Sequence, residues 1–160
     1  MKHCSVVLMA GMFCLAMATP ASAQIFNFVF PIDAAQQVPP NGSPGTGIGD
    51  VTYNQGTGNL DWNITFSGLT STQTAAHFHG PAPFGVNAGI QVPIGVGSPA
   101  IGSAPITAAQ GADLLNGLWY VNIHTQMFPG GEIRGQVVPE PSTLAMMGLA
   151  AVAVLRRRRC

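Results

Sequence analysis

The central part of this chain is poor in cysteine and in basic residues. All three cysteines, Cys4, Cys14 and Cys160, lie outside residues 24–138. That stretch therefore forms no disulfide and offers no thiolate as nucleophile or metal ligand. It also has a single basic residue, Arg134, against five carboxylates, a formal net charge of −4. Because nucleic acid binding needs several Lys and Arg side chains on the phosphates, nucleic acid is excluded as a partner.

Residues 24–138 also lack the sequence patterns of common catalytic sites. They contain no Gly-x-Ser-x-Gly nucleophile motif. The five carboxylates are scattered and include no adjacent pair suited to acid–base catalysis. A Ser-His-Asp triad stays an open alternative, because triads are defined by geometry and not by sequence order. We therefore expect a protein that is not an enzyme.

The N-terminus has the pattern of an export signal. Lys2 is followed by an apolar run over residues 6–18 and then by the small residues Ala21-Ser22-Ala23. This order predicts a secretory signal peptide over residues 1–23, cleaved before Gln24. The apolar run is shorter than the roughly 20 residues that span a bilayer, so we expect the segment to be removed and not kept as an anchor.

The C-terminal segment, residues 139–160, ends in an apolar run and a block of four arginines, Arg156, Arg157, Arg158 and Arg159. An arginine block after an apolar run keeps that end in the cytoplasm, so the pattern predicts a short, weakly anchoring helix with the domain outside. With its motif Pro139-Glu140-Pro141, the segment resembles the PEP-CTERM sorting signal of Gram-negative bacteria. The resemblance implies transient inner-membrane anchoring, cleavage by an exosortase-type sorting enzyme, and delivery to the cell envelope, surface or extracellular matrix. A plain tail anchor is the alternative.

Alternation of apolar and polar residues predicts β-strands between these two ends. Leu60, Trp62, Ile64 and Phe66 alternate with polar residues, and the segment 25–30 alternates around its phenylalanines. Turn-forming residues separate such runs at 39–42, 54–58 and 129–131, a spacing that suits an antiparallel sandwich or barrel. Residues 107–116 are the only helical candidate: Thr107 could cap the helix, and Gly111 and Gly117 would keep it short. We therefore predict one all-β domain over residues 24–138.

The three histidines of this domain fall on predicted strands. His77 and His79 flank Phe78, so both point away from the core if Phe78 points inward. In the predicted hairpin over residues 118–137, His124 shares a face with Tyr120 and Asn122, opposite the apolar residues. The same alternation puts Glu132 and Arg134 on the outer face of the second strand. All of these side chains are expected to face solvent.

Two histidines at positions i and i+2 of a strand are about 6.6 Å apart, close enough for both rings to bind one metal ion. His124, on another strand, would complete a three-histidine site. Three imidazoles without thiolate suit copper or zinc, with copper favoured by the usual order of affinities. The alternative is that His77, His79 and His124 are exposed polar residues and that Glu132 and Arg134 form a surface ion pair, worth about 0–1 kcal/mol. Another ligand, such as a carbohydrate, is a third possibility.

Several motifs spread along the domain are similar to those of the CHRD (chordin-type) family: Val38-Pro39-Pro40, the 60–66 strand, and the segments 75–82, 120–125 and 130–136. The resemblance implies an antiparallel immunoglobulin-like or Greek-key β-sandwich of poorly defined function. Residues that recur in the family match here at His77, His79, His124, Glu132 and Arg134. The H-x-H strand and later histidine are also similar to the copper ligands of copper/zinc superoxide dismutases. The domain lacks that family's second-metal histidines and disulfide, so dismutase activity is not expected.

Together these patterns predict an exported bacterial surface or matrix module with a non-enzymatic binding or structural role. An exopolysaccharide or a surface protein is the expected partner, and the Gly/Pro-rich span 81–105 is the expected contact surface, since binding residues concentrate on loops held by a rigid scaffold. The alternative function is mononuclear copper or zinc binding through His77, His79 and His124.

Overall fold

The computed structural model describes residues 24–139. The predicted signal peptide and the segment 140–160, which contains Glu140, Pro141 and the four arginines, lie outside the described residues. None of the helices within 24–139 has the length and apolar character needed to cross a membrane.

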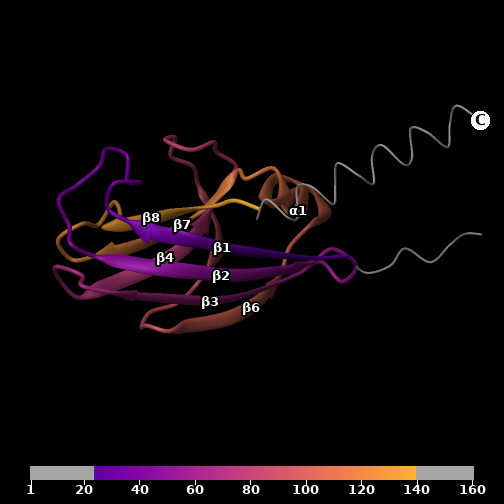
Figure 1. Cartoon of the computed structure of the whole chain (residues 1–160), viewed down its shortest axis with the longest axis horizontal. Coiled ribbons are helices and arrows are strands. Elements are labelled where there is room, and N and C mark those ends of the chain that lie inside the picture. The colour runs from indigo at the N-terminus through magenta and orange to yellow at the C-terminus, as the bar shows by residue number, and fades with distance from the viewer. Residues whose placement is uncertain (1–23, 140–160) are drawn as a thin grey trace, which may run out of the picture.

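The described residues form eight strands and one short helix (Figure 1). In chain order these are β1 (Ile25–Asp33), β2 (Thr46–Asn54), β3 (Asn59–Ser67), β4 (Gln73–His79), β5 (Ile90–Pro93), β6 (Ala100–Pro105), α1 (Ala108–Leu115), β7 (Trp119–Thr125) and β8 (Ile133–Val137). The predicted all-β class is confirmed. The Gly/Pro-rich span 81–105, predicted as loops, contains two short edge strands, β5 and β6.

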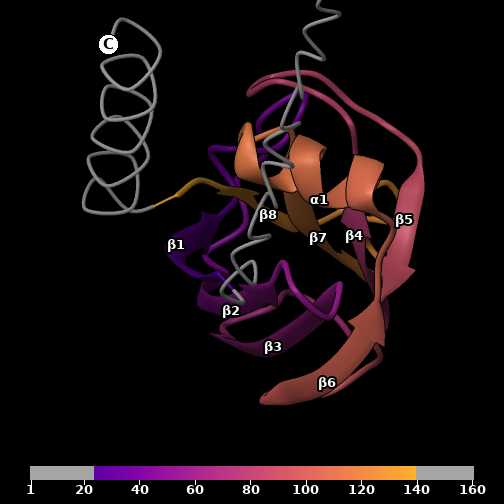
Figure 2. The same cartoon turned by 90° about the vertical axis from the view of Figure 1, so that its right-hand side faces the viewer.

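All strands belong to one antiparallel sheet with the order β5-β4-β7-β8-β1-β2-β3-β6. The order has two halves, β5-β4-β7-β8 and β1-β2-β3-β6. They are joined by a single register pair between Asp33 of β1 and Arg134 of β8. Figure 2 shows the halves facing each other across the interior, with the edge strands β5 and β6 approaching on the opposite side. The sheet is thus a sandwich-like, nearly closed structure whose neighbours β4–β7 and β3–β6 are crossovers of the Greek-key type.

The core fills the space between the two halves. Phe26, Phe28 and Phe30 of β1 are buried, while Ile25 and Val29 of the same strand are half-exposed, so the alternation seen in the sequence is confirmed. Each inward side chain stabilises the fold by about 25 cal/mol for every Å² of apolar surface that it removes from water. Other buried core residues on the facing strands include Leu60, Trp62, Ile64, Phe78, Trp119, Val121, Ile123 and Ile133.

Helix α1 lies across one end of the sandwich (Figure 2). The Thr107 side chain accepts a hydrogen bond from the backbone of Gln110, and the Gln110 side chain accepts one from the backbone of Thr107, a complete capping box. Leu114 is buried in the core. Gly117, at φ +69°, follows the C-cap residue, where a left-handed residue ends the helix. The prediction of a short helix with these two ends is confirmed.

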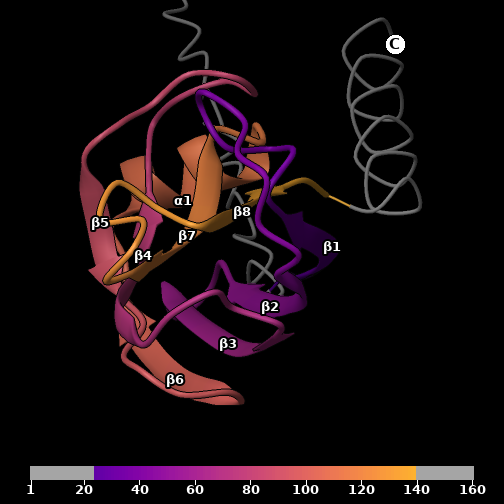
Figure 3. The same cartoon turned by 90° about the vertical axis from the view of Figure 1, so that its left-hand side faces the viewer.

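Loops cover the outer face of β7 and β8, the face that points away from the core. All five residues of β8 are buried, as are all residues of β7 except His124, which is half-buried. The covering segments are the loop 34–45 after β1 and the loop 80–89 after β4, which Figure 3 shows together above this face. They are joined by a hydrogen bond of 3.1 Å from Asn87 Nδ2 to the Val38 carbonyl. This face carries the residues on which the functional hypotheses rest.

Candidate metal centre

Strand pairing brings the three histidines together. β4 and β7 are antiparallel neighbours, with Ala75 opposite His124 and His77 opposite Asn122. His124 is therefore diagonal to His77 on the same face of the sheet. The ring centroids are 5.2 Å apart for His77 and His124, 5.6 Å for His77 and His79, and 5.8 Å for His79 and His124.

One nitrogen from each ring lies within 4.8 Å of the other two. Metal–nitrogen bonds of about 2.0–2.1 Å in a tetrahedral site put ligand nitrogens about 3.3 Å apart, so movements of the order of 1 Å would complete such a site. Among residues 24–139, these three side chains are the one group of three or more His, Cys, Asp or Glu residues close enough to hold a metal ion.

Backbone carbonyls fix the orientation of two of the rings. His79 Nδ1 is 3.0 Å from the Ala88 carbonyl oxygen, and His124 Nδ1 is 2.9 Å from the Pro129 carbonyl oxygen. A carbonyl oxygen only accepts hydrogen bonds, so each Nδ1 carries the hydrogen and each Nε2 keeps its lone pair. Metal-binding histidines in proteins are held in this way through the ring nitrogen that does not bind the metal.

Three of the remaining ring nitrogens are buried without a protein partner. His79 Nε2, His124 Nε2 and His77 Nδ1 are each inaccessible to solvent and make no hydrogen bond within the protein. A buried polar atom without a partner costs about 1–3 kcal/mol. The three atoms belong to the same three side chains that each offer a nitrogen within 4.8 Å of the other two.

The surroundings of His77 and His79 favour neutral imidazoles. Burial is the main cause that lowers the pKa of His79, and the charges of His124, His77 and Arg134 lower it further, although the hydrogen bond to Ala88 raises it. Burial and the neighbouring His124 likewise lower the pKa of His77. A neutral imidazole is the form that binds a metal ion, so burial keeps His77 and His79 in the binding form near neutral pH.

The predicted exposure of the histidines is only partly right. His79 is buried, with 8 % of its surface exposed, and His77 and His124 are half-buried. The side chains do point away from the core, as the alternation indicates, but loop residues such as Ala88 and Pro129 lie against the rings. The site is therefore a partly enclosed cluster and not a row of solvated side chains.

Glu132 and Arg134 are buried, so the prediction that they form an exposed surface pair is wrong. Their exposed fractions are 0 % and 1 %. Glu132 accepts hydrogen bonds of 2.6 Å from Ser43 Oγ, from the Thr70 backbone and from Thr125 Oγ1. Its carboxylate therefore fastens two loops to the end of β7, next to His124.

Arg134 lies instead on Tyr120. Its guanidinium carbon is 3.5 Å from the centroid of the Tyr120 ring. It donates hydrogen bonds to the Val86 carbonyl, to Asn87 Oδ1 and to Gln136 Oε1 at 3.0, 3.2 and 3.1 Å. Burial is the main cause that lowers its pKa. The guanidinium thus connects the sheet to the loop that covers it.

Tyr120 and Asn122 are site residues to which the sequence patterns assigned no role. Tyr120 stacks on His79 with ring centroids 5.0 Å apart and planes 8° apart. Asn122 accepts a hydrogen bond of 2.7 Å from Gln37 and donates one of 3.1 Å to the Gly130 carbonyl. Both share a strand face with His124, so the alternation along this strand could have indicated that they lie near the histidines. The roles of the Ala88 and Pro129 carbonyls could not be predicted from the sequence, because every residue has a backbone carbonyl.

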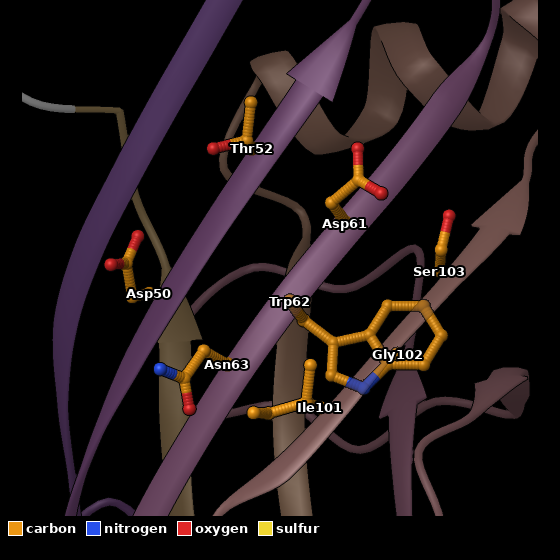
Figure 4. A pocket seen from close by; sticks show the side chains of 8 residues that line it. All are labelled: Asp50, Thr52, Asp61, Trp62, Asn63, Ile101, Gly102 and Ser103. Atoms are coloured by element: carbon orange, nitrogen blue, oxygen red, sulfur yellow. The ribbon is translucent and has the colours of Figure 1, made fainter.

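A separate hollow of about 530 Å³ lies on the outer face of β2, β3 and β6 (Figure 4). Asp50 and Asp61 line it from neighbouring strands, and both are exposed. Asn59 Nδ2 donates to Asp61 Oδ1 at 2.9 Å and to Ser103 Oγ at 2.8 Å. Trp62 Nε1 is the one lining side-chain atom that is buried without a hydrogen-bond partner, but it belongs to a core side chain and is a donor that cannot bind a cation. We therefore read this face as a solvated sheet surface.

Comparison with known families agrees with this picture. The profile of the CHRD domain matches residues 28–137. The chain belongs to the CHRD domain family. The profile of the PEP-CTERM protein-sorting motif matches residues 137–159. No curated protein and no solved structure is significantly similar to the chain.

The two matches place the CHRD domain in an exported protein. A PEP-CTERM motif marks a protein that is processed by an exosortase-type sorting enzyme and delivered to the cell envelope or surface. Of the motif Pro139-Glu140-Pro141, only Pro139 lies in the described residues. The resemblances to both families that were inferred from the sequence are confirmed.

Proposed function

We propose that this CHRD domain binds one copper or zinc ion through His77, His79 and His124, and that it does so as a non-enzymatic module of an exported surface protein. The observation that carries the proposal is the set of three buried ring nitrogens without protein partners on side chains that lie within reach of one ion. Two of the rings are oriented through their other nitrogen, Nδ1, by backbone carbonyls. The matched families are a domain and a sorting signal, not a catalytic family, which supports a binding role.

Copper is the metal that the donor set favours. Three imidazoles and no thiolate suit both copper and zinc, and copper binds such nitrogen sites more tightly. His77 and His124 are half-buried while His79 is buried, so an ion would reach the site from the side of His77 and His124. That access leaves room for a solvent molecule as a further ligand.

The test is a calorimetric titration of the domain, residues 24–139, with copper and with zinc. The parent should bind one equivalent, and His77→Ala/His79→Ala/His124→Ala should lose this binding. The matched control is Asp50→Asn/Asp61→Asn, which removes the two carboxylates of the hollow in Figure 4. Binding that survives in the histidine variant but is lost in the aspartate variant would refute the proposal and assign the ion to that hollow.

A second part of the proposal is that the span 81–105 binds a partner outside the cell. Phe84, Val86, Ile90 and Val96 in the span 81–105 are exposed, with 48–67 % of their surfaces accessible. Exposed apolar side chains on loops and on a short edge strand favour a surface protein over an exopolysaccharide. Co-sedimentation with envelope fractions and with purified exopolysaccharide tests this, using Phe84→Ser/Val96→Ser. Binding to envelope material that is equal in the parent and the variant would contradict it.

We also propose that the sorting segment anchors the protein in the inner membrane only transiently. Removal of residues 138–160 should release the domain from the envelope pathway. Fractionation of cells that express the full and the shortened chain measures this. Unchanged envelope localisation of the shortened chain would contradict the proposal.

A further inference from the structure

We propose that Tyr120 and Arg134 act as positioning residues that hold His79 in the orientation needed to bind a metal ion. The consequence for metal affinity rests on the proposed function above, whereas the effect on the orientation of His79 does not. Neither residue is proposed to bind the ion; both act on His79 through the segment 86–88 and through ring stacking.

The first step is the contact between Tyr120 and Ala88. The Ala88 backbone donates a hydrogen bond of 2.9 Å to the Tyr120 hydroxyl oxygen, and that hydroxyl lies 3.3 Å from the Ala88 carbonyl oxygen. The same carbonyl accepts the hydrogen of His79 Nδ1 at 3.0 Å. The Tyr120 hydroxyl therefore contacts both the N–H and the C=O of the residue whose carbonyl holds the imidazole, while its ring stacks on the same imidazole at 5.0 Å.

The second step is the contact between Arg134 and the residues before Ala88. Arg134 donates to the Val86 carbonyl and to Asn87 Oδ1, so its guanidinium holds the two preceding residues of the loop. It also packs on the Tyr120 ring at 3.5 Å. In the sheet, β4 and β8 flank β7 on opposite sides, so the imidazole and the guanidinium lie on opposite sides of Tyr120. Arg134 thus holds both the loop segment 86–87 and the Tyr120 ring in place.

The chemistry of Arg134 supports a geometric role. It is 99 % buried, and its hydrogen-bond partners among residues 24–139 are two side-chain amides and a backbone carbonyl, with no carboxylate. An apolar side chain of similar size would avoid the desolvation cost of a buried charge. A positive charge near a metal site also opposes binding of a cation. The guanidinium is therefore useful here for its planar set of N–H donors, which hydrogen-bond to the loop.

Arg134 has two opposing effects on metal binding: its charge repels the ion, and its hydrogen bonds position the loop. Informative substitutions separate these two effects. Arg134→Lys keeps the positive charge and removes the planar donor geometry, so electrostatic repulsion of the ion changes little and positioning is lost. Tyr120→Phe keeps the stacked ring and removes the hydroxyl contacts with Ala88. Tyr53→Phe is the matched control, because Tyr53 is a buried tyrosine of β2, which is not a neighbour of β4 or β7 in the sheet.

The experiment uses nitrogen–proton correlation NMR to observe the imidazole nitrogens of the metal-free domain, residues 24–139. This range holds the core of the described part of the chain. In the parent, His79 and His124 should both carry the hydrogen on Nδ1. In Tyr120→Phe and Arg134→Lys, His79 should become a mixture of the two tautomers, while His124, held by Pro129, stays unchanged as the internal control. Tyr53→Phe should leave both histidines unchanged.

Zinc titration of the same proteins gives the second readout. Loss of a group that orients a metal-binding histidine weakens affinity by about 10–100-fold, and we expect this for both site variants and not for Tyr53→Phe. Unchanged His79 tautomers in both site variants would overturn the inference, whatever the parent does with zinc. Failure of the parent to bind zinc or copper would refute the proposed function, and the tautomers would still decide the role of Tyr120 and Arg134. If Arg134→Lys fails to fold, Tyr120→Phe decides alone.

Discussion

Replacement of Glu132 by glutamine should destabilise the domain strongly while it preserves the size and shape of the side chain. The fully buried carboxylate accepts three hydrogen bonds of 2.6 Å, from Ser43, Thr70 and Thr125. Hydrogen bonds to a charged group contribute about 1.5–3 kcal/mol each and neutral ones about 0.5–1.5 kcal/mol, so the loss is about 1 kcal/mol for each bond. Glu132→Gln should therefore lower the free energy of unfolding by about 2–4 kcal/mol, a large part of the usual total of about 5–15 kcal/mol.

The effect of this substitution should depend on pH. Burial raises the pKa of Glu132, but the hydrogen bonds from Ser43, Thr125 and Thr70 outweigh burial and hold the pKa below its ordinary value. A carboxyl group with a lowered pKa in the folded state stabilises the protein above its unfolded pKa of about 4.3, and this contribution is lost as the pH falls through the folded pKa. The difference between parent and Glu132→Gln should shrink on acidification below about pH 4.

Urea unfolding and thermal melts of residues 24–139 measure this prediction. At pH 7 the melting temperature of Glu132→Gln should fall by roughly 10 °C or more. Asp61→Asn is the matched control: Asp61 is exposed and its loss should change the free energy of unfolding by no more than about 0.5 kcal/mol. A change below about 0.5 kcal/mol in Glu132→Gln as well would refute the argument that the buried carboxylate fastens the loops.

Three further predictions concern pH, core packing and capping. Because burial lowers the pKa values of His77 and His79, the metal-free domain should lose stability as the pH falls below about 6.5, and a histidine-free variant should lose less, as urea unfolding at several pH values would show. Gly49→Ala should cost about 1–3 kcal/mol in urea unfolding because the added methyl group would collide with the Phe30 ring; an unchanged midpoint would contradict this packing. Thr107→Ala removes the side-chain cap of α1 and should cost about 1 kcal/mol, whereas Thr107→Ser should restore most of it.

The grouping of the histidines could be predicted because it follows from strand periodicity. His77 and His79 lie two residues apart on β4, and His124 lies on a neighbouring strand with its side chain on the same face. The alternation of Trp119, Val121 and Ile123 with polar residues fixed which face that was. Simple local rules held here because a strand with one apolar face has little choice of orientation.

The burial of Glu132 and Arg134 could not be predicted by the same rules. Alternation states which side chains point away from the core, but not what lies over them. The cover comes from the loops 34–45 and 80–89, whose glycines, prolines and polar residues carry no periodic signal. Contacts such as Ser43 with Glu132 or Asn87 with Arg134 span 89 and 47 residues, so only the folded structure brings them together.

The most direct test of a three-histidine metal centre is electron paramagnetic resonance of the domain with one equivalent of Cu²⁺. Coupling to three imidazole nitrogens should appear in the parent, to two in His124→Ala, and should be unchanged in the carboxylate variant Asp50→Asn/Asp61→Asn. A parent spectrum dominated by oxygen ligands, or one that does not change when His77, His79 and His124 are removed, would contradict the account.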